Sequence, residues 1–239
     1  RQLMCVYHNW CYDLQGRLTT IAFERGVQGK GGMPAGFSKG QHGLTVLRTH
    51  AINGLVFGTL SPAAPTLEEY LTPPIAAKIR RVFNRKLEVI GRYTQTLPNN
   101  WKLYAENIRD TYHASLLHVF HNTFGVVRPN MGGGVKLSES GWHHLSYTQR
   151  ESLGDNEIAK EKVRSMQDSY KLKDVRMMEH KLELGDLVTN SIQTVFPTLV
   201  VQQILNALAV RQLVPRGPER SELIWTVLGF EDDDAEMTE

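Results

Sequence analysis

The chain of 239 residues has few cysteines, almost no excess of charge and no long apolar run. Its two cysteines exclude a fold held together by a framework of disulfides. The balance of 27 Lys and Arg against 25 Asp and Glu does not indicate nucleic acid or an anionic membrane as a partner. Residues 195–214 form the most apolar stretch, but Pro197 and several polar side chains interrupt it, so no transmembrane helix is expected.

The chain does contain enough apolar material for a substantial core. Hydrophobic residues make up 41% of it and aromatic residues 8%, which at this length predicts one or two globular domains. No internal repeat or low-complexity tract is present. Residues that could carry chemistry gather in two places, one near the N-terminus and one close to the middle of the chain.

Acids and histidines collect in residues 99–121 at spacings typical of a helix. Because residues three and four apart share a helix face, Glu106, Asp110 and His113 are expected to form one stripe, with Asn107 beside it. The stripe sets carboxylates against an imidazole. This arrangement is typical of a metal site.

The same segment contains two further histidines, His118 and His121. His118 follows His113 by five residues, which on a regular helix turns it about 140° away. Both imidazoles can therefore reach one metal ion only if the helix loosens or ends between them. A single helical histidine is more often a surface or core residue than a ligand, and His121 is interpreted in that way.

Near the N-terminus, a Cys-x2-His pair formed by Cys5 and His8 precedes an aromatic residue and an Asp-x-x-Gly sequence. Such a pair also occurs in zinc sites and by chance, so alone it is weak evidence. The second cysteine, Cys11, is interpreted as a buried, inert thiol, which is the usual state of a free cysteine.

Taken together, the two segments resemble the catalytic (alpha) subunit of the Rieske non-haem iron ring-hydroxylating oxygenases. The central segment, from Asn100 to His118, contains the Asn-Trp-Lys, Glu-Asn and Asp-x-Tyr-His-x4-His elements of that family. The pair of Cys5 and His8 looks like the second half of a Rieske motif. The resemblance covers nearly the whole chain and is greatest to the oxygenases that act on terephthalate, anthranilate and salicylate.

The resemblance implies two metal centres. Cys5 and His8 are expected to be ligands of a Rieske [2Fe–2S] cluster, in which two thiolates hold one iron and two imidazoles the other. His113 and His118 are expected to bind a mononuclear Fe(II) together with a carboxylate. The other Cys-x-His half and this carboxylate are expected outside the sequence, so we interpret the chain as a fragment lacking both ends.

For activity, the resemblance implies the terminal oxygenase component of a dioxygenase. With O2 and with electrons that a reductase or ferredoxin relays from NAD(P)H, it would cis-dihydroxylate the ring of an aromatic carboxylate such as terephthalate or anthranilate. One alternative is a ring monooxygenase of the same family, of the salicylate hydroxylase type. Two alternatives from other classes are a Rieske ferredoxin and an iron-free helix-grip protein that only binds a ligand.

The resemblance also gives Asp110 a role in electron transfer. In the family, the aspartate at this position bridges an iron-ligand histidine and a Rieske histidine of a neighbouring subunit, so Asp110 is expected to link His113 to His8 of another chain. This role implies an oligomer, either a homotrimer or an alpha/beta hetero-oligomer. The alternative is that Asp110 pairs with Arg109 or caps a helix, and Asn107 is expected to support the site as a polar group. Iron chemistry and few cysteines favour the cytoplasm.

Arg211 is the candidate for binding the substrate, because it interrupts an apolar strand. A guanidinium that faces a pocket is suited to bidentate binding of a carboxylate. Since side chains alternate along a strand, Arg211 could equally point away from the pocket.

For the fold, we expect an α+β protein with a partial all-β Rieske domain over residues 1–62 and a helix-grip catalytic domain over residues 63–239. A proline-bearing linker is expected at 61–74, a short amphipathic helix at 75–83 and an irregular, helix-bearing segment at 151–183. The expected strands cover residues 18–23, 44–48, 55–60, 87–93, 142–147, 192–196, 199–204, 208–214 and 223–228. The resemblance implies an antiparallel sheet wrapped on a helix, with the iron between them.

Overall fold

The computed structural model describes residues 1–127, 131–150 and 170–238. The chain divides into two compact units, the first made of residues 1–50 and 56–64 and the second of residues 51–55 and 65–239. The boundary expected from the sequence lay between residues 62 and 63, and the identity of the first unit stays a prediction. No helix of the described chain is long and apolar enough to cross a membrane.

The first unit contains a small antiparallel sheet in the order β1-β2-β3. Its strands are β1 (Leu3–Met4), β2 (Cys11–Tyr12) and β3 (Leu18–Thr20), and a 3-10 helix, η1 (Lys39–Gln41), follows a glycine-rich loop. Leu18 is buried, and the rings of Trp10 and Phe37 lie 5.9 Å apart beside His42. This core is small because most of the segment is loop.

Two further strands, β4 (Arg48–Ile52) and β5 (Leu55–Thr59), form a two-stranded sheet. The residues of this hairpin are divided between the two units. The strand expected over residues 44–48 is wrong, because only Arg48 belongs to β4. Leu44 instead lies in a loop, where its N–H donates to the carbonyl of the distant Gly16. The strand expected over residues 18–23 ends at Thr20.

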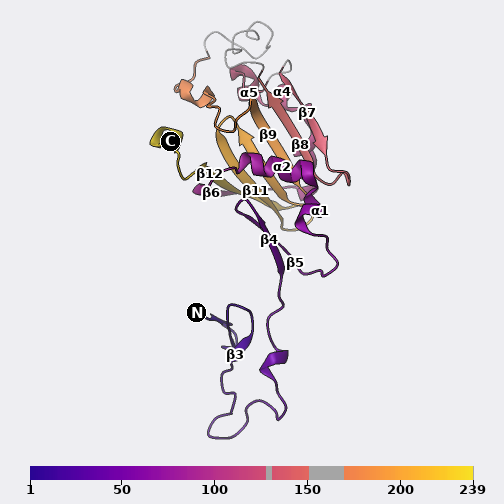
Figure 1. The fold of residues 1–239 in the computed structure, drawn as a ribbon, viewed down its shortest axis with the longest axis vertical. Helices are drawn as coiled ribbons and strands as arrows, with labels where there is room; N and C mark the ends of the chain where they lie inside the picture. Colours follow the sequence, from indigo (N-terminus) through magenta and orange to yellow (C-terminus); the bar gives the residue numbers. More distant parts are fainter. Residues whose placement is uncertain (128–130, 151–169, 239) are drawn as a thin grey trace. The chain divides into compact units, whose positions relative to one another are not determined.

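The second unit is built on a seven-stranded antiparallel sheet in the order β6-β12-β11-β10-β9-β8-β7 (Figure 1). Its strands are β6 (Leu87–Leu97), β7 (Gly132–Leu137), β8 (His144–Gln149), β9 (Val188–Val195), β10 (Leu199–Ile204), β11 (Ala207–Pro215) and β12 (Ser221–Phe230). Strands β9 to β12 are joined as consecutive hairpins, as the turn residues between their apolar runs predict. The expected α+β class is confirmed.

Six helices and one further 3-10 helix accompany this sheet in the described residues. They are α1 (Leu67–Leu71), α2 (Pro73–Val82), α3 (Trp101–Arg109), α4 (Ala114–Leu117), α5 (Val119–Phe124), η3 (Val175–Met178) and α6 (Ala235–Thr238). Of the segment expected to be irregular and helix-bearing, residues 151–169 lie outside the described residues. The described remainder contains η3.

Helices pack on both faces of the sheet. Helix α2 crosses one face (Figure 1), where its buried Ile75 accepts a hydrogen bond from Gln193 of β9 through its backbone carbonyl. The next residue, Thr194, lines a pocket beneath α3. Because consecutive strand residues point to opposite faces, α2 and α3 lie on opposite sides of β9. This arrangement buries both faces of the central strands and agrees with the expected sheet wrapped on a helix.

Several elements were missed from the sequence: helix α1 and strand β7, and also the short elements β1, β2, η1 and α6. Helix α1 lies in the expected linker and begins with a capping box, in which the Thr66 side chain accepts from Glu69 N–H and the Glu69 carboxylate accepts from Thr66 N–H. This Thr-x-x-Glu signal was available. Strand β7 was missed because it begins with three consecutive glycines, which read as a loop.

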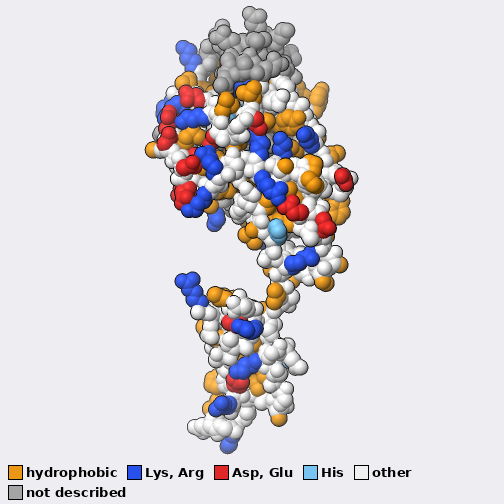
Figure 2. All heavy atoms as spheres, viewed as in Figure 1, with side chains coloured by type: hydrophobic (Ala, Val, Ile, Leu, Met, Phe, Trp, Pro, Cys, Tyr) orange, Lys and Arg blue, Asp and Glu red, His pale blue; other side chains and the backbone are white. Residues whose placement is uncertain are grey.

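Charged side chains of both signs are interspersed over the face of the protein that Figure 2 shows. In the second unit, the Arg85 guanidinium reaches Glu183 at 2.7 Å and Asp232 at 3.1 Å. It also lies 3.8 Å from the centre of the Phe230 ring. Exposed ion pairs contribute little stability individually, so the sheet and its buried contacts carry most of the fold.

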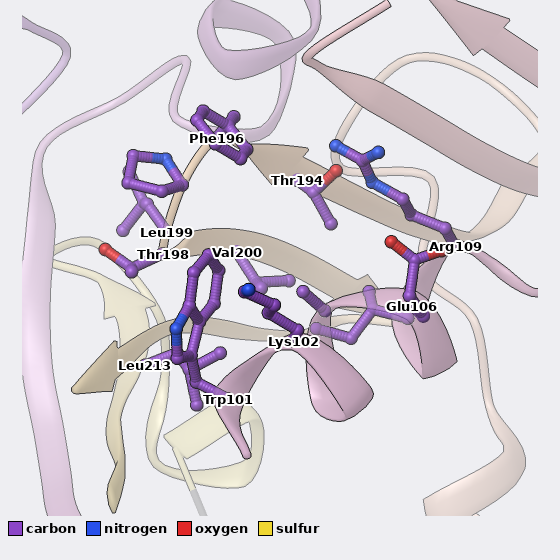
Figure 3. A pocket seen from close by; sticks show the side chains of 13 residues that line it. Trp101, Lys102, Glu106, Arg109, Thr194, Phe196, Thr198, Leu199, Val200 and Leu213 are labelled. Carbon is purple, nitrogen blue, oxygen red and sulfur yellow. The ribbon is translucent and has the colours of Figure 1, made fainter. Parts of the chain in front are cut away.

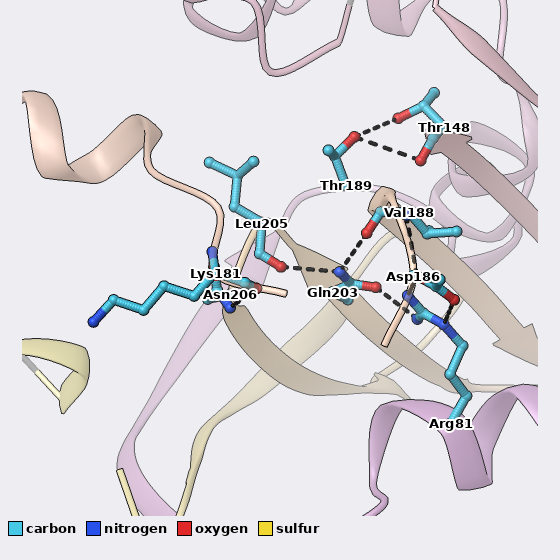
Figure 4. Close-up of polar contacts among 9 residues, drawn as sticks. All are labelled: Arg81, Thr148, Lys181, Asp186, Val188, Thr189, Gln203, Leu205 and Asn206. Carbon is cyan, nitrogen blue, oxygen red and sulfur yellow. Dashed lines mark hydrogen bonds and ion pairs between the residues drawn. The ribbon is translucent and has the colours of Figure 1, made fainter. Parts of the chain in front are cut away.

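A buried polar network joins α2 to the sheet (Figure 4). Arg81 of α2 forms a bidentate pair with Asp186, and its Nη1 donates to Gln203 Oε1 at 2.8 Å. Gln203 is fully buried, and its Nε2 donates to the backbone carbonyls of Val188 and Leu205 at 2.8 and 2.9 Å. Burial alone would raise the pKa of Asp186, but the hydrogen bonds from Arg81 and the Val188 N–H outweigh it and lower the pKa.

Replacing Gln203 by Leu should destabilise the second unit by about 2–4 kcal/mol, because it leaves one Arg81 donor and two backbone carbonyls buried without partners. The free energy of unfolding in urea measures this loss. Gln212→Leu is the matched control, since Gln212 lies exposed on β11. Equal stability of the two variants would show that the network does not hold α2 to the sheet.

Candidate functional site

Helix α3 supports the candidate site and ends earlier than the sequence predicts. It begins at Asn100, whose side chain accepts from the Lys102 N–H at 3.1 Å and donates to the Pro218 carbonyl at 2.8 Å. It ends at Asp110, which has extended backbone angles. The expected single helix through this region is therefore wrong, and α4 and α5 follow as separate short helices. The stripe of Glu106, Asp110 and His113 does not form on one helix.

A second break falls at His118, between α4 and α5. Its backbone angles, φ −83° and ψ 75°, are not helical. The ring centres of His113 and His118 lie 5.1 Å apart, and those of His118 and His121 lie 5.2 Å apart. The helix is therefore broken between His113 and His121, as binding of one metal ion by His113 and His118 requires. The break brings all three imidazoles close together.

The His113 ring lies between two polar side chains. Its Nε2 is 3.4 Å from the amide nitrogen of Asn107, and its Nδ1 is 3.2 Å from the carboxylate of Asp110. His113 Nδ1 is buried and makes no hydrogen bond within the described residues, although the Asp110 carboxylate lies close to it. Asn107 therefore lies on the Nε2 side of the ring, and Asp110 lies on the Nδ1 side.

Asp110 also serves the local backbone. Its carboxylate accepts from the Tyr112 N–H at 2.8 Å, which lowers the pKa of Asp110, and the His113 backbone and ring act in the same direction. Asp110 occupies the C-cap position of α3, where its backbone N–H donates to the Glu106 carbonyl at 3.1 Å. It does not pair with Arg109, whose guanidinium donates instead to the Trp142 carbonyl. Half of the carboxylate surface remains exposed.

The electrostatic environment favours neutral imidazoles. Burial lowers the pKa of His118, and the positive charges of His113 and Arg211 lower it further. Burial also lowers the pKa of His121, with His118 as a second cause. A neutral imidazole offers a nitrogen lone pair, which is the form that binds metal ions.

Glu106 lies on another face of α3 from Asn107. With Lys102 and Arg109 it lines a pocket of about 310 Å³ between α3 and the turn joining β9 to β10 (Figure 3). Thr194 and Val200 of the sheet also line this pocket. None of the three histidines does, so Glu106 is separated from the histidine cluster.

Arg211 lies on the side of the sheet that α3 covers. Its Nη1 donates to the Tyr104 hydroxyl at 2.8 Å, and its guanidinium lies 4.5 Å from the centre of the Trp225 ring. Its charge is close enough to lower the pKa of His118. Of the two orientations considered from the sequence, the one toward the helix is present, while binding of a carboxylate stays a prediction.

Tyr104 and Trp225 were not singled out from the sequence. Tyr104 lies three residues before Asn107, so helical spacing placed it on the same face and was an available signal. No such signal existed for Trp225, because its position opposite Arg211 depends on the register between β11 and β12.

In the first unit, Cys5 and His8 lie on one exposed turn between β1 and β2. The turn is closed by the Asn9 N–H, which donates to the Cys5 carbonyl at 2.9 Å, and Asn9 has a positive φ of 57°. The Asp-x-x-Gly sequence forms the following turn, where the Asp13 carboxylate accepts from the Gln15 N–H at 2.9 Å. Cys11 is half-buried, with its Sγ 3.7 Å from the Asn9 carbonyl.

The donor sets fit the implied metals in part. Two neighbouring imidazoles and a nearby amide suit a mononuclear iron, and an exposed thiol and imidazole on one turn supply one ligand type for each iron of a Rieske cluster. In the ranges that the structure describes, no three His, Cys, Asp or Glu side chains form a group that could hold a metal ion. The residues present therefore offer two candidate ligands toward each implied centre.

Residues 84–239 match the family model for the ring-hydroxylating alpha subunit (catalytic domain). The chain is 51% identical to the alpha subunit 2 of the terminal oxygenase component of terephthalate 1,2-dioxygenase from Comamonas sp, over 98% of this chain and 57% of that protein. It is 39% identical to the large subunit of anthranilate 1,2-dioxygenase from Burkholderia cepacia, over 98% of this chain and 56% of that protein. The chain thus spans just over half the length of these curated relatives.

Solved structures show the same fold. Naphthalene 1,2-dioxygenase from Rhodococcus sp bound to indole matches with a TM-score of 0.69 and 23% identity, over 98% of this chain and 55% of that chain. A quaternary ammonium Rieske monooxygenase matches with a TM-score of 0.66 and 18% identity, over 99% of this chain and 55% of that chain. The match to the family model over residues 84–239 confirms the resemblance found in the sequence, and the chain belongs to the family of ring-hydroxylating alpha subunits.

Proposed function

We propose that the protein is the terminal oxygenase component of a ring-hydroxylating dioxygenase that acts on an aromatic carboxylate. The observation that carries this proposal is the pair of His113 and His118, whose rings lie 5.1 Å apart across a helix break. An iron-free ligand-binding protein would have no need for two imidazoles brought together at a helix break. The products formed from terephthalate and anthranilate by the product of the complete gene, supplied with a reductase, test the proposal.

His113 and His118 are the proposed ligands of the mononuclear Fe(II), with a carboxylate as the proposed third ligand. Cys5 and His8 are the proposed ligands of the Rieske cluster. When bound, the cluster would relay electrons and the mononuclear iron would supply the O2-activating chemistry. The chain supplies the imidazoles, and Asn107 and Asp110 orient the His113 ring from either side.

Asp110 is proposed to connect two chains. Its carboxylate lies 3.2 Å from the His113 Nδ1 and remains half exposed, so one side can accept a further hydrogen bond. The proposed donor is His8 of another chain, which makes an oligomer part of the active site. A homotrimer and an alpha/beta hetero-oligomer both meet this need. The proposed electron donors are a reductase and a ferredoxin, with NAD(P)H as their source.

Arg211 is proposed to bind the carboxylate of the substrate. Replacing it by Gln should raise the KM for terephthalate by about 10- to 100-fold, because a charge-assisted hydrogen-bonded pair contributes roughly 1.5–3 kcal/mol. The KM for an uncharged ring of similar size should change far less. Steady-state kinetics with both substrates measure the difference, and equal losses on the two would contradict a role for Arg211 in carboxylate binding.

A second candidate is a ring monooxygenase of the same family. The observation that favours it is a 37% identity to the large oxygenase component of salicylate 5-hydroxylase from Ralstonia sp, over 100% of this chain and 58% of that protein. The two reactions differ in their products, since a dioxygenase yields a cis-dihydrodiol-type product and a monooxygenase a single new hydroxyl group. Mass spectrometry of products made under 18O2 distinguishes one incorporated oxygen atom from two.

A further inference from the structure

We propose that Tyr104 and Trp225 are positioning residues that hold the Arg211 guanidinium so that its Nε–Nη2 edge binds the substrate carboxylate side-on. This inference rests on the proposed function and deepens it, because it names the residues that select a carboxylated ring. It also specifies which edge of Arg211 makes the contact.

The first support is the way in which Arg211 is held. The Tyr104 hydroxyl accepts from Nη1 at 2.8 Å, which ties one end of the guanidinium to α3. Cζ of the guanidinium lies over the Trp225 ring, 4.5 Å from the ring centre. A cation over an indole ring is an attractive arrangement, so Trp225 favours this plane for the group.

Trp225 is itself fixed. Its ring stacks on Tyr93 of β6, with centres 5.4 Å apart and planes 12° apart. Its Nε1 donates to the Gln95 side chain at 2.9 Å. Arg211, Trp225 and Tyr93 occupy paired positions on three adjacent strands, so they form one row across the sheet. The guanidinium is therefore held in a defined orientation before a ligand arrives.

The second support is the edge left free. Nε of Arg211 is buried and has no hydrogen-bond partner within the described part of the chain. None of the ion pairs found there includes Arg211, and Nη2 donates to no described residue. A buried guanidinium N–H without an acceptor is unfavourable. Nε and Nη2 donate in parallel from one edge, and that geometry matches the two oxygens of a carboxylate.

The third support is the position of this edge. Tyr104, which holds Arg211, lies one helical turn before Asn107, and the Asn107 amide is 3.4 Å from His113 Nε2, so a carboxylate on Arg211 is held on the face of α3 that carries the proposed iron site. No described carboxylate forms an ion pair with Arg211, so a bound anion would offset the charge of its guanidinium. The ligand class is thus an aromatic ring with at least one carboxylate.

The test is direct binding of benzoate and of benzamide, its uncharged analogue, to the product of the complete gene, measured by isothermal titration calorimetry without turnover. Tyr104→Phe keeps the ring but removes the hydroxyl, and is expected to weaken benzoate binding by about tenfold while benzamide binding is unchanged. Trp225→Leu is expected to act in the same direction. Tyr147→Phe is the matched control, because Tyr147 contacts Lys78 on the face of the sheet that α2 covers.

Arg211→Lys distinguishes the contribution of the Nε–Nη2 edge from that of the positive charge. Lys keeps the charge but cannot bind a carboxylate side-on. It is expected to bind benzoate as weakly as Arg211→Gln. Full affinity in Tyr104→Phe together with a loss in Arg211→Gln overturns the positioning role and leaves the proposed substrate site intact. Full affinity in Arg211→Lys overturns side-on binding. No loss in Arg211→Gln contradicts the proposed substrate site itself.

Discussion

Replacing His113 or His118 by Ala should reduce ring oxidation to background, because each substitution removes one of two imidazoles that lie 5.1 Å apart at the helix break. Two ligands from this chain leave little redundancy, so loss of either one should release the metal. Product formed per enzyme molecule, with saturating reductase and O2, measures the effect. We expect a loss of at least about a thousandfold, since the proposed function assigns the O2 chemistry to this iron.

His121→Ala is the matched control for these variants. Its ring lies 5.2 Å from that of His118, but it is not proposed as a ligand, and most activity should remain. The visible absorption of the Rieske cluster should be the same in all three variants, which shows that the rest of the protein has folded. If His121→Ala is inactive while His113→Ala or His118→Ala retains activity, the ligand assignment is wrong.

Asp110→Asn should lower turnover by about 10- to 100-fold while leaving the mononuclear iron in place. The substitution preserves shape and keeps an oxygen that can accept from the Tyr112 N–H, so the end of α3 should be undisturbed. It removes the negative charge that faces His113 at 3.2 Å. A carboxylate in that position orients the ring and can accept a hydrogen bond from the ring N–H of a second histidine. A neutral amide is a weaker acceptor for both imidazoles.

Iron content and turnover must be measured together for Asp110→Asn. Reduced turnover with full iron content fits a connecting role between two chains, and the electron transfer rate in a single turnover should fall by the same factor. Glu106→Gln is the control on the same helix, because Glu106 lines the pocket on another face of α3. Unchanged turnover in Asp110→Asn contradicts the bridge, and loss of iron would make Asp110 a support of the ligand rather than a bridge.

Much of the fold could be predicted from the sequence because its elements carry local signals. The strands β10, β11 and β12 are apolar runs bounded by turn residues, and all three lie close to the expected ranges. Helix α2 was expected because its apolar residues recur at helical spacing, and its buried side chains confirm this. The pairing order of the seven strands depends on contacts far apart in the chain, which no local pattern contains.

The candidate site was predictable in its residues but not in its geometry. The spacing of His113 and His118 required a break in the helix, yet it did not show where α3 would end. The actual end at Asp110 separates Glu106 from the histidines and places Asn107 against the His113 ring. The local hydrogen bond from Tyr112 N–H to Asp110 decides this, and side-chain propensity does not reveal it.

The most direct test of a shared iron site is the amount of mononuclear iron bound after anaerobic reconstitution with Fe(II). It is measured in the unmodified protein and in the His113→Ala, His118→Ala and His121→Ala variants, with cluster iron subtracted from its absorbance. We predict one mononuclear iron per chain in the unmodified protein and in His121→Ala, and almost none in the other two. Retention of that iron in both His113→Ala and His118→Ala would contradict the assignment of these histidines as its ligands.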